Sequence, residues 1–240
     1  MTDAPPLSGA RAVAPVRVYR QVADDLERRI SAGEFKIGER LPTERALAGE
    51  YSVSRTCVRE ALLAMEIAGL VSIRVGSGVF VLATEIPQTR ARTLRAHQHG
   101  PSELLEARLV IEPELAALAA ARAGDAEIAT IAEAIEIMRE EHRLAAESER
   151  GDRIFHSTIA SAAHNGLLQA MIEEVWTEMS APMWQALQAH IRSPLLRLGW
   201  IEDHEAVLAA LCARDRRRAR SAMKAHIERV RDTLDKAKFL

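Results

Sequence analysis

The sequence predicts a mainly α-helical chain, in which a small unit of short helices and a β-hairpin is followed by an all-α helical bundle. The chain has 240 residues, of which 48% are hydrophobic and only 4% aromatic, a balance that favours helices. Residues 41–80 combine two short helical patterns with a glycine-tipped hairpin, whereas no credible strand follows Ser102. The length suffices for a small domain and one larger domain with its own core.

The elements of residues 41–80 follow one another as helix, turn, helix and hairpin. A first helix is expected over residues 43–51, and Ser54 can cap a second helix that runs to about residue 68. Residues 70–74 and 79–82 predict two strands around a Gly-Ser-Gly turn. This order of elements defines a winged helix-turn-helix, with a further helix expected before it over residues 18–32.

Polar and basic side chains are expected at the exposed N-terminal end of the second helix, where a recognition helix presents its base-reading residues. Guanidinium groups suit both phosphate and the guanine edge. The candidate DNA-contacting side chains are Arg45, Ser54, Arg55, Thr56, Arg59 and Arg74. The alternative is that any helical pair with a hairpin shows this pattern. A net charge of -2 neither supports nor excludes DNA binding, so affinity would have to come from a local surface.

The segment from Val18 to Val81 resembles the N-terminal domain of the GntR family of bacterial transcription regulators. The matching pieces, in the family's order and spacing, are GEFKIGERLPTERALA, SRTCVREALLAMEIAGLV and RVGSGVFV. The resemblance implies a homodimer that reads a palindromic operator in double-stranded DNA. It places Arg45, Arg55 and Arg59 at DNA-contact positions and Gly76 at the wing tip, which reaches the minor groove.

Four segments are expected along the chain. Residues 1–17 form a disordered tail, residues 18–82 the winged helix, residues 83–101 a linker without a sustained apolar period, and residues 102–240 the all-α domain. The helices expected in that last domain cover residues 102–124, 125–148, 150–163, 166–179, 182–192, 200–213 and 216–237.

Two cysteines, Cys57 and Cys212, lie far apart without metal-type spacing, which favours a reduced cytoplasmic protein. No apolar run is long enough to cross a membrane, and the N-terminus lacks the pattern of a secretion signal. The sequence therefore predicts a cytoplasmic chain with no membrane partner.

A second set of polar residues is brought together by helical geometry. Asp152 and His156 are four residues apart and project from one helix face. His204 and His226 lie on either side of a break at residues 214–215, so an antiparallel helix pair brings them level with each other. Imidazole and carboxylate together suit zinc, nickel, manganese or iron, with zinc preferred. The alternative is that buried histidines are simply hydrogen-bonded.

The segments DRIFHSTIASAAHNGLL and DHEAVLAALCARDRRRARSAMKAHIERV resemble the FCD ligand-binding domain of the FadR branch of the GntR family. The resemblance implies that Asp152, His156, His204 and His226 hold a divalent metal ion. The stretch SELLEARLVIEPELAALAA is similar to the first helix of that domain, which implies that Arg108 pairs with a ligand carboxylate. Alternatively, Arg108 is a structural partner of Glu112 or another acid. The short linker leaves the number of helices before Arg108 open.

Three classes of function are compatible with these patterns. The first is a ligand-responsive transcription regulator, a repressor released by a small organic acid bound at a metal site. The second is a regulator whose helical domain binds an acyl chain or another non-metal ligand. The third is a helical metallohydrolase, but the sequence offers no nucleophile motif and no general base beyond Asp152. The first class is favoured, and an enzyme is not expected.

Overall fold

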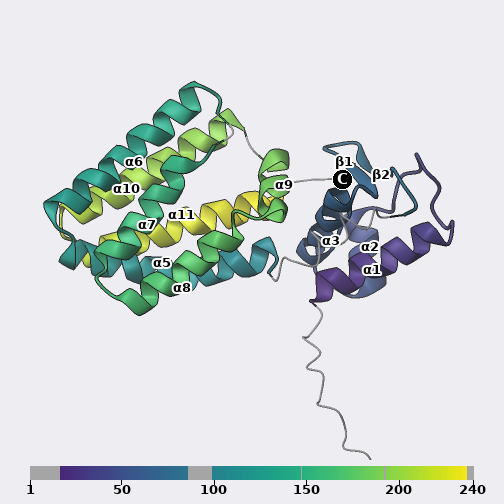
Figure 1. The fold of residues 1–240 in the computed structure, drawn as a ribbon, viewed down its shortest axis with the longest axis horizontal. Helices are drawn as coiled ribbons and strands as arrows, with labels where there is room; N and C mark the ends of the chain where they lie inside the picture. Colours follow the sequence, from purple (N-terminus) through teal and green to yellow (C-terminus); the bar gives the residue numbers. More distant parts are fainter. Residues whose placement is uncertain (1–16, 86–98, 147, 192, 237–240) are drawn as a thin grey trace, which may run out of the picture.

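The computed structural model describes residues 17–85, 99–146, 148–191 and 193–236. The expected N-terminal tail, apart from Arg17, and most of the expected linker lie outside the described residues. Figure 1 shows a small N-terminal unit beside a larger helical bundle, with helix α9 between them.

The N-terminal unit consists of three helices and a two-stranded antiparallel sheet. Its elements are α1 (Val18–Ser31), α2 (Glu44–Tyr51), α3 (Arg55–Ala68), β1 (Val71–Arg74) and β2 (Gly78–Val81). The strands pair from Val71 with Val81 to Arg74 with Gly78, and the turn between them forms the wing. The predicted winged helix-turn-helix is confirmed.

Local side-chain chemistry sets the bounds of the two central helices. Thr43 Oγ1 accepts a hydrogen bond from the Ala46 amide at 3.2 Å, which caps α2. Ser54 Oγ accepts from the Cys57 amide at 3.1 Å and caps α3, as the sequence predicted. Gly69 ends α3 with φ +80, a left-handed conformation that favours glycine.

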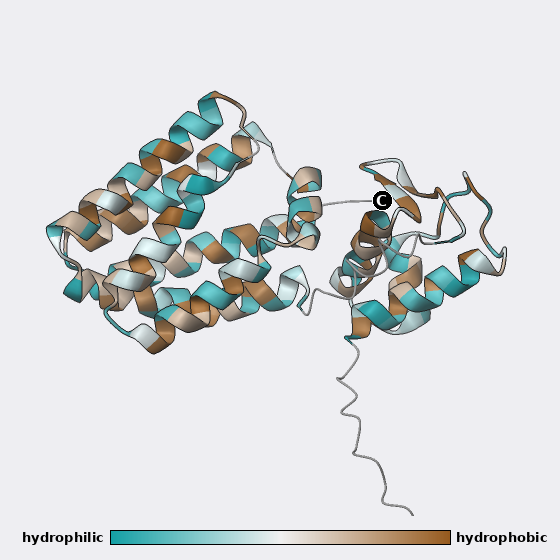
Figure 2. Cartoon of the chain, viewed as in Figure 1, coloured by the Kyte–Doolittle hydropathy of each residue, from teal (hydrophilic) through white to brown (hydrophobic). Residues whose placement is uncertain are grey.

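The bundle is all-helical over its described residues. Its helices are α5 (Pro101–Arg122), α6 (Asp125–Arg143), α7 (Arg150–Ala162), α8 (Gly166–Glu178), α9 (Pro182–Ile191), α10 (Pro194–Cys212) and α11 (Arg216–Lys236). Helix α5 packs along α11, and α6 packs along α7. Most helices carry both apolar and polar residues, so each can bury one side and expose another (Figure 2). The predicted class, mainly α with a small hairpin, is confirmed.

Helix α10 differs from the sequence-based expectation, because it begins at Pro194 and not near residue 200. Ser193 Oγ accepts a hydrogen bond from the Leu196 amide at 3.2 Å and caps the added turn. Arg108 lies on α5, which is the first helix in the described part of the bundle.

The two units contact each other directly. Glu60 on α3 accepts hydrogen bonds from the Ser102 amide at 2.8 Å and from its hydroxyl at 2.6 Å, at the start of α5. Arg17 forms an ion pair with Glu103 at 2.5 Å. Over the described residues, no helix is long and apolar enough to cross a membrane.

Candidate metal centre and nucleic-acid interface

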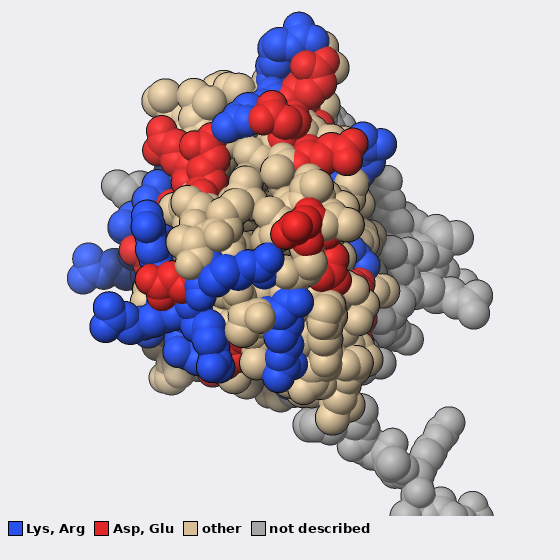
Figure 3. Space-filling view, turned by 90° about the vertical axis from the view of Figure 1, so that its left-hand side faces the viewer, with Lys and Arg blue, Asp and Glu red and all other residues tan. Residues whose placement is uncertain are grey.

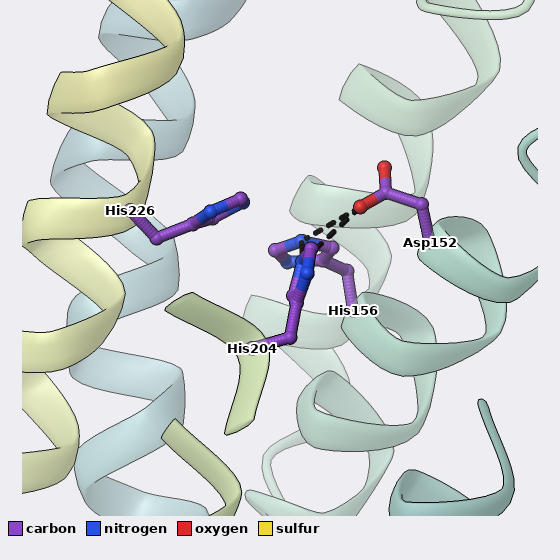
Figure 4. A group of neighbouring side chains, drawn as sticks. All are labelled: Asp152, His156, His204 and His226. Atoms are coloured by element: carbon purple, nitrogen blue, oxygen red, sulfur yellow. Dashed lines mark hydrogen bonds and ion pairs between the residues drawn. The ribbon is translucent and has the colours of Figure 1, made fainter. Parts of the chain in front are cut away.

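Asp152, His156, His204 and His226 converge inside the bundle, as their spacing predicted. Helix α7 carries the first two, α10 carries His204 and α11 carries His226 (Figure 4). One potential ligand atom from each residue lies within 4.8 Å of the others. His204 Nε2 lies 3.2 Å from Asp152 Oδ1 and 3.3 Å from His156 Nε2.

The three histidines of the cluster are buried and Asp152 is half-buried, and burial and hydrogen bonding together set their protonation. Burial and the charges of His204 and His156 hold the pKa of His226 well below its usual value. Burial also lowers the pKa of His204, although Asp152 opposes this. Burial alone would raise the pKa of Asp152, but its hydrogen bonds with His156 and His204 hold it well below the usual value. Burial alone would lower the pKa of His156, but the charge of Glu112 raises it. The set therefore offers the Asp152 carboxylate and two imidazoles, those of His204 and His226, whose lowered pKa values favour the neutral form that binds metals.

The outer ring nitrogens of two histidines face carboxylates. His156 Nδ1 lies 2.5 Å from Glu112 Oε2, and His226 Nδ1 lies 3.6 Å from Asp203 Oδ2. Metal-binding histidines commonly direct their second nitrogen to a carboxylate in this way. This arrangement at His156 and His226 fits a divalent metal ion bound by these side chains.

Arg108 is buried beside the cluster and pairs with Glu112. Its Nε lies 2.6 Å from Glu112 Oε1, and its Nη2 lies 3.2 Å from His156 Nε2. Its guanidinium group also lies 4.5 Å from the centre of a Trp176 ring. Burial would raise the pKa of Glu112, but the charges of Arg108 and His156 lower it to about 2. The structural pairing considered from sequence is thus present, and a ligand role for Arg108 stays a prediction.

A cavity adjoins the cluster. Arg108, Asp152, His204 and His226 belong to its wall. The other lining residues come mainly from α6, α9, α10 and α11, and include Glu141, Trp184, Gln188, Arg197, Trp200 and Val230. A molecule in this cavity would therefore meet the candidate metal ligands, a guanidinium group and two indole rings.

Most of the candidate DNA-contacting residues lie on the surface of the winged helix. Arg45, Ser54 and Arg55 are exposed, and Thr56 is half-buried. Arg74 is exposed, with its guanidinium group 4.7 Å from the centre of the Phe80 ring. Exposed Gly76 has φ +76 in the turn between the strands, a left-handed conformation that glycine adopts without strain.

The expected exposure of Arg59 is wrong. Only 3% of its side chain is accessible, because Glu44 accepts hydrogen bonds from its Nε and Nη2 at 3.2 and 3.1 Å. Its Nη1 donates to the backbone carbonyl of Leu234 on α11. The side chain therefore lies between the two units and not on the surface.

Three acidic residues of these sites were not predicted as site residues. Glu44 binds both Arg59 and, at 3.5 Å, Arg55. Glu112 and Asp203 face the ring nitrogens of metal-candidate histidines. The spacing of Arg108 and Glu112 signals their mutual pair, but no sequence pattern links Glu112 to His156 on another helix.

Basic side chains are not confined to the winged helix. The end of the bundle that faces away from it carries both basic and acidic groups (Figure 3). Exposed Arg216, Arg217 and Arg218 lie at the start of α11, whereas Arg220 pairs with Glu114 at 2.6 Å. This mixture agrees with a net charge of -2, so DNA affinity has to come from a local surface.

A winged helix joined to a helical domain, with a cavity beside a cluster of histidines and an aspartate, defines a DNA-binding regulator that responds to a ligand. Residues 18–81 match the family described as "Bacterial regulatory proteins, gntR family", and residues 103–229 match the FCD domain. The chain belongs to the GntR family of transcription regulators and carries an FCD domain.

Curated relatives agree with this assignment. The chain is 37% identical over 234 residues to the "Uxu operon transcriptional regulator" of Escherichia coli (strain K12), covering 93% of this chain and 89% of that protein. It is 36% identical over 220 residues to the "Exu regulon transcriptional regulator" of the same strain, covering 90% and 84%. The solved structure "E. coli McbR/YncC" shares the fold, with a TM-score of 0.50, 24% identity and coverage of 92% and 99%. The chain is a ligand-responsive, DNA-binding transcription regulator.

Proposed function

We propose that this regulator is a repressor released when a small organic acid binds at a divalent metal ion in the helical domain. Zinc is the preferred ion, with nickel, manganese and iron as alternatives. The observation that carries the proposal is the convergence of Asp152, His156, His204 and His226 within 4.8 Å. Bound there, the ion would supply a positive charge and coordination positions for a carboxylate.

Arg108 would hold the other end of the acid. The Arg108 Nη2 group is 3.2 Å from His156 Nε2, so a cation at His156 would repel the guanidinium group. A ligand carboxylate between the two positive charges would offset this repulsion. Arg108 also lines the cavity while Glu112 orients it, which supports a role in binding the acid.

The DNA-reading surface in this proposal consists of the recognition helix, its neighbour and the wing. The proposed contacts are Arg45, Ser54, Arg55, Thr56, Arg59, Arg74 and Gly76. A single winged helix buries little DNA surface, so tight binding favours a homodimer on a palindromic operator. Arg59 would have to leave its present position to take part.

Elemental analysis and calorimetry test the metal site. The purified chain should contain about one divalent ion per chain, whereas His204→Ala and His226→Ala should lose it because each removes one of four ligands. Arg108→Ala should retain the ion but lose binding of an organic acid. The acid is found by a thermal-shift screen of metabolite acids with and without zinc. Stoichiometric metal in both histidine variants would refute the assigned site.

Light scattering tests the assembly. The proposal requires a dimer at micromolar concentration and one dimer on each palindromic duplex. A monomer that binds an isolated half-site tightly would contradict this part of the proposal without touching the metal site.

A further inference from the structure

The recognition helix α3 packs against the bundle through part of the surface that the proposed function assigns to DNA. Thr56, Arg59 and Leu63 of α3 line a small cavity together with Leu187 of α9 and Leu234 of α11. Figure 1 shows α3 on the side of the winged helix that faces the bundle. Part of the α3 surface is therefore covered by the helical bundle of the same chain.

Arg59 is held in this interface by matched polar groups. Glu44 binds one edge of its guanidinium group through both carboxylate oxygens, and Nη1 donates to the Leu234 carbonyl. Leu234 lies in the last turn of α11, where carbonyls lack an intrahelical partner and carry partial negative charge. Arg59 satisfies this carbonyl, so the contact is chemically complementary. We name the contact between Arg59 and Leu234 the clasp.

The clasp is incompatible with a contact from Arg59 to DNA. A guanidinium group has to reach solvent to meet a phosphate or a base edge, but Arg59 is only 3% exposed. Arg55, one turn earlier on the same helix, is 57% exposed in its side chain. In this conformation the Arg55 side chain is accessible to DNA, whereas the Arg59 side chain is not.

Helix α11 connects the clasp to the candidate metal centre. His226, Val230 and Leu234 follow one another at four-residue spacing and therefore lie near one helix face. His226 and Val230 line the cavity beside the candidate metal centre, and the Leu234 carbonyl accepts a hydrogen bond from Arg59. Leu234 lies eight residues after His226, a separation of about 12 Å along a rigid helix. A shift of α11 at the cavity is thus carried to Arg59.

A second contact ties α3 and the wing to the bundle. His190 Nε2 on α9 lies 2.5 Å from Glu66 Oε2 on α3. The other oxygen, Glu66 Oε1, accepts a hydrogen bond from the Ile73 amide of β1 at 2.7 Å. Helix α9 also places Trp184 and Gln188 in the wall of the cavity beside the candidate metal centre. The recognition helix is therefore attached to two helices that line this cavity.

We propose that this docked arrangement is the conformation that the protein adopts when it is not bound to DNA. In it, α11 and α9 contact the recognition helix, and the clasp keeps Arg59 away from DNA. The inference rests on the DNA-reading role of α3 in the proposed function, but it needs neither the metal nor the acid. Binding to DNA requires the clasp to open, so contacts that stabilise docking weaken DNA binding.

Shortening the chain tests the clasp directly. Removal of residues 232–240 deletes the Leu234 carbonyl and leaves His226 and Val230 in place. The test DNA is a duplex selected from a random pool by the full-length protein, and its affinity is measured by fluorescence anisotropy. The shortened chain should bind this duplex about five to a hundred times more tightly, the usual range of coupling between two states. Adding Arg59→Ala should abolish the gain.

A double substitution tests docking without altering the chain's length. Glu66→Gln with His190→Ala removes the second contact and should also tighten binding. The matched control is His164→Ala, which breaks the exposed pair of His164 with Glu127 elsewhere in the bundle and should have no effect. If the shortened chain does not fold, the DNA affinity of the doubly substituted variant alone tests whether docking weakens DNA binding.

The outcomes separate this inference from the proposed function. Unchanged or weaker DNA binding in the Glu66→Gln, His190→Ala variant and in a folded shortened chain would overturn the clasp. Full sequence-specific binding by Arg55→Ala would instead refute the assigned reading surface. Loss of binding in Arg55→Ala together with no gain on undocking would refute the clasp alone.

Discussion

A single buried carboxylate, Glu112, connects three neighbours at the candidate metal centre. It pairs with Arg108, lies 2.5 Å from His156 Nδ1 and accepts a hydrogen bond from Trp176 Nε1 at 3.2 Å. Both Glu112 and Arg108 are almost completely buried. Removing the charge of one partner leaves the other buried without compensation, which is far more destabilising than the loss of a surface pair.

Glu112→Gln should therefore lower the free energy of unfolding by about 3 to 5 kcal/mol, measured by urea denaturation of the metal-free chain. The same substitution should weaken zinc binding by about tenfold to a hundredfold, because it changes the partner that orients His156. The control is Glu114→Gln on the same helix, since the pair of Glu114 with Arg220 is exposed. Equal stability of the two variants would show that the buried pair contributes no more than the surface pair.

The two exposed arginines of the winged helix should differ in their contribution to DNA binding. Arg55→Ala should lose about 1 to 3 kcal/mol of binding to the selected duplex and little binding to random DNA, if Arg55 contacts a base. Arg45→Ala should weaken both duplexes alike and reduce the salt dependence, as expected for a phosphate contact. Anisotropy titrations at several salt concentrations measure both effects. Identical losses on both duplexes for Arg55→Ala would contradict base reading.

The residue scale also shows where sequence reasoning is limited. Helical spacing was sufficient to bring Asp152 next to His156, and the length of the α10–α11 hairpin placed His204 beside His226. The burial of Arg59 could not be predicted in this way, because its partners Glu44 and Leu234 are 15 and 175 residues away along the chain. Contacts between domains leave no periodic pattern in the sequence.

At the scale of elements, capping side chains mark the starts of several helices. Asp215 Oδ1 accepts a hydrogen bond from the Arg218 amide at 3.0 Å and caps α11. The start of α10 at Pro194 was missed, although Ser193 followed by proline is a typical start signal. The first turns of α10 carry exposed Leu195 and Leu198, so the apolar pattern that predicts helices does not mark this start.

Ser54 allows capping and DNA contact to be tested separately, because it caps α3 at the end expected to meet DNA. Ser54→Ala should lower the free energy of unfolding by about 1 kcal/mol through loss of the cap. Ser54→Asp should keep that stability, since aspartate also caps, but weaken DNA binding because its charge repels phosphate. Urea unfolding and anisotropy measure the two effects. Normal DNA affinity of Ser54→Asp would place this helix end away from the phosphates.

At the scale of the whole molecule, the candidate metal centre joins helices that are distant in sequence. Asp152 and His156 come from α7, His204 from α10 and His226 from α11. A ligand that binds the folded state alone stabilises that state by mass action. Because the four side chains lie apart in the unfolded chain, metal bound at this centre should act as a link between the helices.

Zinc should therefore raise the melting temperature of the metal-free chain. At a free concentration 100 times the dissociation constant, the expected stabilisation is about 2.7 kcal/mol. His204→Ala should abolish the zinc-dependent shift, because it removes the only proposed ligand from α10. His164→Ala provides the control, since His164 is exposed and pairs with Glu127 away from the cluster. Differential scanning calorimetry with and without a chelator makes the measurement. A zinc shift that persists in His204→Ala but disappears in His164→Ala would move the metal away from the buried centre and, with it, the proposed position of the acid.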